Sequence, residues 1–79
     1  MNKNQLLRTV VRNQFMVSTV LLRYTGTGFR PEYETMVFKY DAAAGKVSDW
    51  LELDCLRNDT EAGATLDHFD LIMKWSAPE

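Results

Sequence analysis

The sequence contains only one cysteine, Cys55, and one histidine, His68, in 79 residues. A lone cysteine excludes an internal disulfide and suits a reducing compartment, so we expect a cytoplasmic protein. A lone histidine leaves a structural zinc site short of ligands, so we expect no metal. Uncharged apolar runs such as residues 20–22 are far shorter than the roughly 18 residues of a membrane span. We therefore expect no membrane association.

Acidic residues are absent from residues 1–31, which carry five basic ones, whereas residues 32–79 carry all eleven acids and four bases. Such asymmetry can mark a basic arm for an acidic partner. It also fits two halves that pack with opposite charges adjacent, which is the arrangement we expect. A sequence pI near 5.3 argues against a dedicated nucleic-acid-binding protein. A chain this short is marginally stable unless packing or self-association helps, so we expect a homodimer.

Three segments have the composition of β-strands, namely residues 15–24, 33–40 and 47–56. The second and third segments also alternate with a period of two, which is typical of half-buried strands. Residues 41–46, which contain Gly45, predict a hairpin connection. The expected faces are Met36, Phe38 and Tyr40 against Thr35, Val37 and Lys39, and Leu51, Leu53 and Cys55 against Trp50, Glu52 and Asp54.

The first fourteen residues are harder to assign. Their apolar residues have helical spacing, which fits either a short helix or an extended arm. We interpret residues 1–14 as a basic N-terminal extension and residues 15–77 as a single domain. The apolar residues concerned are Leu6, Leu7, Val10 and Val11.

The C-terminal segment predicts a helix from Glu61 to about Trp75, with Thr60 as its N-cap. At 100° per residue it carries two apolar bands on roughly opposite sides. We expect the first band to cover the sheet and the second band to meet a partner or the N-terminal residues. The first band is Ala62, Leu66, Phe69 and Met73, and the second is Ala64, His68, Leu71 and Trp75.

No set of residues resembles a catalytic centre. Thr25-Gly26-Thr27-Gly28 lacks the third glycine and the following helix of a dinucleotide fingerprint, so it predicts a strand-linking loop. His68 has no local nucleophile or metal ligand, and Cys55 is expected to be a small core residue. Aromatic residues such as Trp50 could stack on bases, but Asp49, Glu52 and Asp54 beside it would repel phosphate.

Several short motifs resemble those of a family of small uncharacterised proteins from bacteriophages that infect actinobacteria. These motifs are Val17-Ser18-Thr19-Val20, Glu34-Thr35-Met36-Val37-Phe38, and Arg57-x-x-Thr60 with His68 eight residues later. The resemblance covers roughly residues 16–75. Asn58-Asp59 replaces a tyrosine-serine pair of the family, and Asp67 replaces a glycine. The resemblance implies a phage or prophage gene and transfers no catalytic residue.

These observations predict an α+β domain with a three-stranded antiparallel sheet and a C-terminal helix on one face (βββα). We expect a non-enzymatic phage accessory protein without cofactor or small-molecule substrate. It would bind a host protein or itself, for example as an inhibitor of host defence such as an anti-CRISPR. The alternative is a nucleic-acid contact through the basic first 31 residues. The residues expected to meet a partner are His68, Leu71, Trp75 and Trp50.

Overall fold

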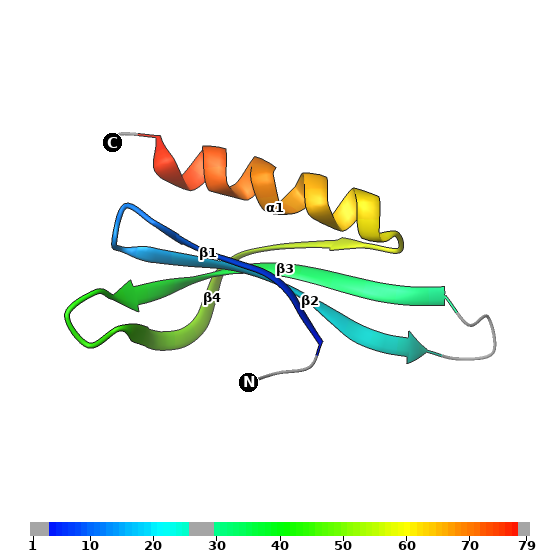
Figure 1. Ribbon diagram of the computed structural model, residues 1–79, viewed down its shortest axis with the longest axis horizontal. Coiled ribbons are helices and arrows are strands. Elements are labelled where there is room, and N and C mark those ends of the chain that lie inside the picture. Colours follow the sequence, from blue (N-terminus) through cyan, green and yellow to red (C-terminus); the bar gives the residue numbers. More distant parts are fainter. Residues whose placement is uncertain (1–3, 26–29, 78–79) are drawn as a thin grey trace.

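The computed structural model describes residues 4–25 and 30–77, with side chains for all of these except residues 23–25 and 30. The elements are β1 (Gln5–Val11), β2 (Phe15–Thr25), β3 (Arg30–Asp41), β4 (Lys46–Asn58) and α1 (Glu61–Ser76). The strands form one antiparallel sheet in chain order, and α1 lies across one face (Figure 1). The predicted α+β class with a C-terminal helix is confirmed. The predicted number of strands is wrong, because the sheet has four strands.

The additional strand is β1, which forms one edge of the sheet rather than a helix or an arm. Its burial alternates with a period of two, and its Val11 lies in the core. A tight turn joins it to β2, with the Gln14 N–H donating to the Val11 carbonyl at 3.0 Å. Arg12 and Asn13 both have positive φ there (55° and 56°), as a type I′ hairpin turn requires. The apolar pairs that suggested a helix therefore belong to a strand.

The two central strands present one face to α1 and the other away from it. Thr35 and Val37 lie on one face and Met36 and Phe38 on the other, as the alternation predicted. Thr35 and Val37 are buried on the helix side, and Met36 and Phe38 lie on the other side, which we call the open face. Residues 26–29, which include most of the predicted Thr-Gly-Thr-Gly loop, lie outside the described residues. The predicted hairpin after Asp41 is confirmed, and Gly45 has a φ of 68° there.

β4 contains a large bulge that the predicted alternation did not include. Its pairing with β3 moves from Val37↔Asp54 directly to Lys39↔Asp49, which leaves residues 50–53 without a regular register. Such bulges bend a strand, and β4 passes from the open-face side of the sheet to the helix side (Figure 1). Leu51 is consequently 71% exposed, whereas Leu53 packs against the core, so the expected common face of these two residues is wrong.

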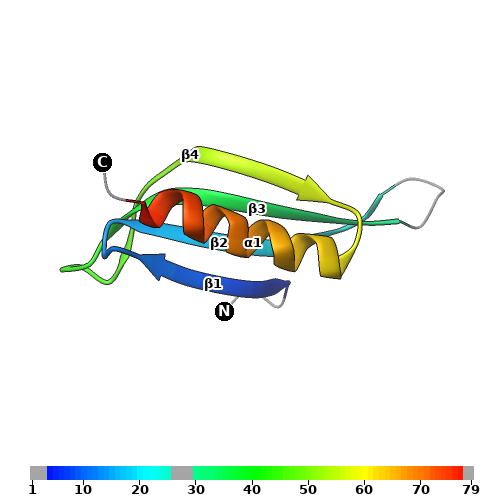
Figure 2. The same cartoon turned by 90° about the horizontal axis from the view of Figure 1, so that it is seen from above.

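α1 begins where the sequence predicts. The Thr60 hydroxyl accepts a hydrogen bond from the Gly63 N–H at 3.0 Å, and Glu61 occupies the first turn. Seen from above, the helix lies over the middle of the sheet, with β1 and β4 along the two sides (Figure 2). Its inner side closes a core whose buried cluster is Val11, Val17, Val37 and Leu71. Within the described residues, no helix has the length and apolar character needed to cross a bilayer.

Candidate interaction surfaces

The two apolar bands of α1 are placed opposite to the prediction. We call Ala62, Leu66, Phe69 and Met73 the outer stripe, and Ala64, His68, Leu71 and Trp75 the inner band. The outer stripe faces away from the sheet, since its three large side chains are 66%, 53% and 73% exposed in that order. The inner band packs against the sheet. The prediction that Met73 and its neighbours cover the sheet is therefore wrong.

His68 is buried at the centre of the helix–sheet contact, where it is 1% exposed. Its Nδ1 lies 2.8 Å from the Thr19 hydroxyl, and its Nε2 lies 2.9 Å from the Thr9 hydroxyl. The Thr19 hydroxyl also lies 2.7 Å from that of Thr35. Burial lowers the pKa of the imidazole below its ordinary value. This side chain cannot meet a partner in the folded chain, which corrects that expectation for His68.

The same correction applies to Leu71, which is 3% exposed in the core cluster, and in part to Trp75. The Trp75 ring packs edge-on against Phe15 at a centroid distance of 4.9 Å. Its Nε1 donates to Asp54 at 3.0 Å, and Lys74 donates to the same carboxylate oxygen at 2.7 Å. The hydrogen bond from Lys74 lowers the pKa of the Asp54 carboxyl. Trp75 thus anchors the end of α1 to β2 and β4.

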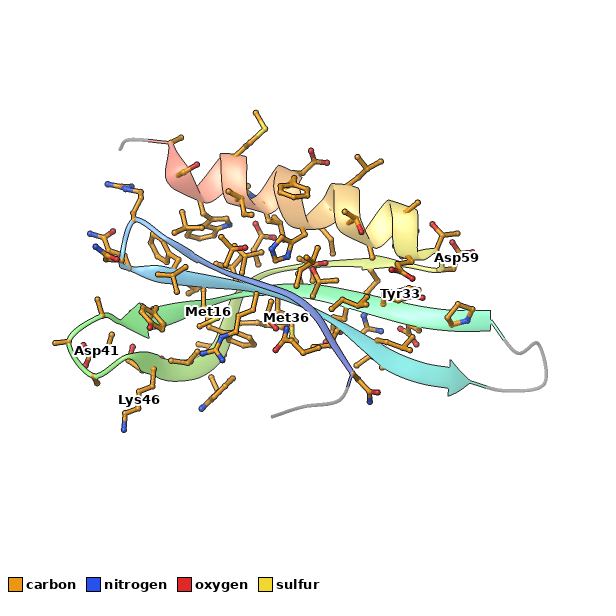
Figure 3. The ribbon with its side chains drawn as sticks, in the orientation of Figure 1. Met16, Tyr33, Met36, Asp41, Lys46 and Asp59 are labelled. Carbon is orange, nitrogen blue, oxygen red and sulfur yellow. The ribbon has the colours of Figure 1, made fainter. Side chains whose placement is uncertain are left out.

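Trp50 is the one expected partner residue that is widely accessible, at 74% exposure. The β4 bulge holds it on the open face, with its ring edge-on to Phe38 at 5.2 Å. It borders a cleft of about 520 Å³ on this face. Figure 3 shows Met16, Met36 and Lys46 on this side of the sheet, away from α1. The cleft is lined by Gln5, Arg8, Met16, Ser18, Val20, Met36, Phe38, Lys46, Val47 and Trp50.

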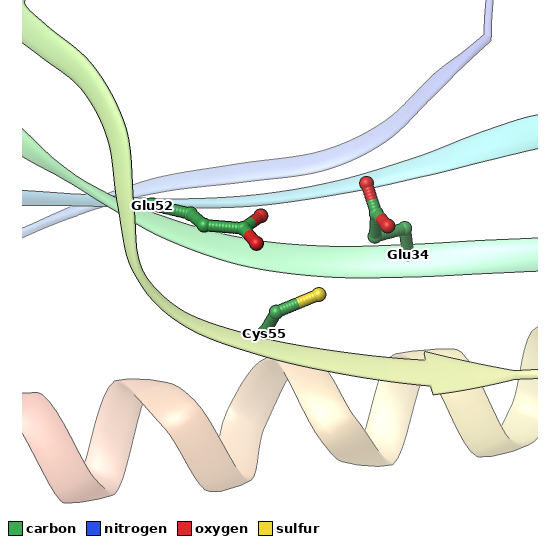
Figure 4. Close-up of side chains that lie close together, drawn as sticks. All are labelled: Glu34, Glu52 and Cys55. Atoms are coloured by element: carbon green, nitrogen blue, oxygen red, sulfur yellow. The ribbon is translucent and has the colours of Figure 1, made fainter.

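Near the β4 edge of the open face, Glu34, Glu52 and Cys55 bring their oxygen and sulfur atoms within 4.8 Å of one another (Figure 4). Arg57 neutralises Glu34 through contacts of 3.0 and 2.9 Å. Burial raises the pKa of the Cys55 thiol, and the two carboxylates raise it further. A raised pKa keeps the Cys55 thiol protonated near neutral pH, and a protonated thiol is a poor nucleophile.

The basic residues of the first 31 positions do not form one face where their side chains are described. Arg8 lies at the cleft, whereas Arg12 lies at the β1–β2 turn and donates to the Ala77 carbonyl at 3.2 Å. The described ion pairs join Arg57 to Glu32 and Glu34, and Lys74 to Asp54. All of these residues belong to the acidic part of the chain. The expected pairing of the two halves by charge is not found among the described residues.

Sequence reasoning missed the hydroxyl network around His68. Thr9, Thr19 and Thr35 lie on three adjacent strands under the helix. Thr19 pairs directly with Thr35, whereas Thr9 pairs with Val17 and so lies diagonally across from Thr19. The available signal was a threonine at an inward position of each segment, opposite a helix with one histidine. Because the first segment was not assigned as a strand, that signal could not be assembled.

Comparisons with protein-family models, with curated proteins and with solved structures found no match for this chain.

Proposed function

We propose that this protein acts by binding another protein through the outer stripe of α1 and carries out no chemistry of its own. The observation that supports this is the exposure of Leu66, Phe69 and Met73 on a helix whose opposite side is fully used by the core. The stripe runs about 16 Å along the helix at 1.5 Å per residue. Water-exposed apolar stripes of this kind mark protein contacts more often than scattered apolar residues do.

The spacing of the stripe indicates the form of its partner. Its four residues follow one another at intervals of four, three and four positions, which is the pattern that packs into the groove of a second helix. A second copy of the chain offers such a helix, and so does a helical host protein. The resemblance to phage proteins makes a host protein, including one of a defence system, the natural foreign partner to try.

Sedimentation velocity between about 1 and 200 μM tests self-association. We expect a dimer whose dissociation constant rises at least tenfold in the Phe69→Ser variant, since truncated aromatic anchors often cost about 2 kcal/mol. Trp50→Ser is the matched control, because it removes an exposed aromatic residue from the other side of the molecule. Equal weakening by both variants would show that the stripe is not the contact.

A photo-crosslinking amino acid tests a foreign partner if the chain stays monomeric. Placed at position 69, it should give a discrete crosslinked species in host extract, and the species should be absent when the group is placed at position 50. Expression of the protein in a host that restricts phage by CRISPR should restore plaques if the partner is a defence protein. A monomer that crosslinks equally from both positions, or from neither, would contradict the proposed function.

A further inference from the structure

The open-face cleft has the size and lining of a small-molecule site. Its volume of about 520 Å³ lies within the roughly 300–1,000 Å³ of typical ligand pockets. Met16 and Phe38 form its buried floor, at 2% and 6% exposure. Methionine side chains adapt to ligands of different shape, and Met36 adds a second one. The floor is therefore apolar and adjustable.

Trp50 forms a wall of this cleft, and in the isolated chain this position leaves most of its apolar surface in water. Its ring touches Phe38 only edge-on, and 74% of the residue stays in water. The β4 bulge fixes this position, because residues 50–53 do not follow the regular register with β3. A ligand lying between Trp50 and the methionines would remove much of that apolar surface from water.

The cleft also carries positive charge that no described carboxylate neutralises. Arg8 has Met16 as its described partner, with Nε 2.9 Å from the sulfur, which is a weak acceptor. Lys46 lies at the rim, and the lining contains no carboxylate. Among the described ion pairs none involves Arg8 or Lys46, whereas Arg57 on the same face engages two carboxylates. The charge complement of this cleft is an anion.

The sheet register gives the cleft a direction. Arg8 pairs with Ser18, Ser18 with Met36, and Met36 with Cys55, so Arg8 and Cys55 lie on opposite edges of one row. Three strand spacings of about 4.8 Å separate them by roughly 14 Å. At the β4 edge Glu34 is paired with Arg57, whereas the carboxylate of Glu52 lies beside Cys55. An anionic group is thus attracted to Arg8 at the β1 edge and repelled by Glu52 at the β4 edge.

We propose that this cleft binds a small amphipathic organic anion, with its apolar body on Met16, Met36 and Trp50 and its anionic group at Arg8. A carboxylate is the simplest such group, because the guanidinium can donate to it from a planar fork. This site lies on the side of the sheet away from α1 and is independent of the outer stripe.

An NMR titration with three ten-carbon probes tests the proposal. Decanoate, decanol and decylammonium share one chain and differ in charge. We expect decanoate to shift the amide signals of Arg8, Ser18 and Val47 and the indole signal of Trp50, and to bind at least tenfold more tightly than decylammonium. Decanol should bind with intermediate affinity. Equal affinity for all three probes, or shifts centred on the outer stripe, would overturn the assignment.

Substitutions distinguish the contribution of the Arg8 charge to probe binding from that of the Trp50 ring. Arg8→Gln should lower the affinity for decanoate about tenfold, which is the scale of losing one charge-assisted hydrogen bond. The same substitution should leave the affinity for decanol unchanged. Arg8→Lys should retain most of the affinity. Trp50→Ala should weaken both probes, and Phe69→Ser should weaken neither. All three substituted positions are exposed, and amide-signal dispersion verifies folding. A short single-stranded oligonucleotide that displaces decanoate and binds more tightly would replace this proposal with a nucleic-acid surface.

Discussion

The two apolar bands of α1 have similar spacing along the sequence but opposite positions in the molecule. The outer stripe is the more hydrophobic of the two, with Leu66, Phe69 and Met73, yet it faces water. The inner band contains a histidine and a tryptophan and is the one that the sheet covers. The comparison teaches that hydrogen bonding, and not apolar content alone, decided which side of this helix was buried.

The physical reason is the polarity of the sheet under the helix. Thr19 and Thr35 are buried there at 0% and 1% exposure, and their hydroxyls need partners. A leucine or methionine from the outer stripe would remove the partner that His68 gives to the Thr9 and Thr19 hydroxyls, and would leave Thr19 with only the Thr35 hydroxyl. A buried polar group left without a partner costs about 1–3 kcal/mol. His68 offers two ring nitrogens at the right place. In the described residues, every buried side-chain nitrogen and oxygen atom has a partner.

Substitutions on the two sides of α1 should differ most in their effect on stability at positions 68 and 69. His68→Ala should lower the free energy of unfolding by about 3–5 kcal/mol, because it leaves a cavity and removes the hydrogen bonds of His68 to the Thr9 and Thr19 hydroxyls. Phe69→Ala removes a larger side chain but should cost within about 1 kcal/mol, because the ring is half exposed. Urea denaturation of both variants measures the difference. If Phe69→Ala were the more damaging, the assignment of the two sides of α1 would be wrong.

A second pair near the end of the helix should show a smaller difference. Trp75→Ala removes the contact with Phe15 and the hydrogen bond to Asp54, and should cost about 2–4 kcal/mol. Met73→Ala should cost within about 0.5 kcal/mol, since Met73 is 73% exposed. Thermal unfolding followed by circular dichroism compares the two. Equal melting temperatures would contradict the anchoring role of Trp75.

Acidification should weaken the contacts of the inner band, whereas the outer stripe contains no titratable side chain. Burial lowers the pKa of His68 in the folded chain. In the unfolded chain the imidazole is exposed to water and has its ordinary pKa of about 6.5. Below that pH the unfolded chain takes up a proton that the folded chain resists, and stability falls as the pH drops below 6.5. Asp54, whose folded pKa is also lowered, adds a separate loss below about 4. Urea titrations between pH 7.5 and 5 should show the first loss in the parent and not in His68→Gln.

The sequence predicts much of the fold because local signals are strong there. The Thr60 cap, the hairpin at Gly45 and the alternation from Thr35 to Phe38 each depend on nearby residues. Three features depended on distant contacts instead. β1 is a strand because β2 pairs with it, the β4 bulge depends on how β4 pairs with β3, and the orientation of α1 follows from hydroxyls on three strands. The open-face cleft combines residues from β1 and β4, so no local pattern indicated it.

The most direct test of the account is a double-mutant cycle between Thr19 and His68. Thr19→Val and His68→Leu each remove one side of the central hydrogen bond while preserving approximate volume. If hydrogen bonding decides which side of α1 is buried, each single variant leaves polar atoms unpartnered and loses stability. The double variant should then recover about 1–3 kcal/mol relative to the sum of the two losses. A coupling energy near zero, with the two losses simply additive, would contradict the account.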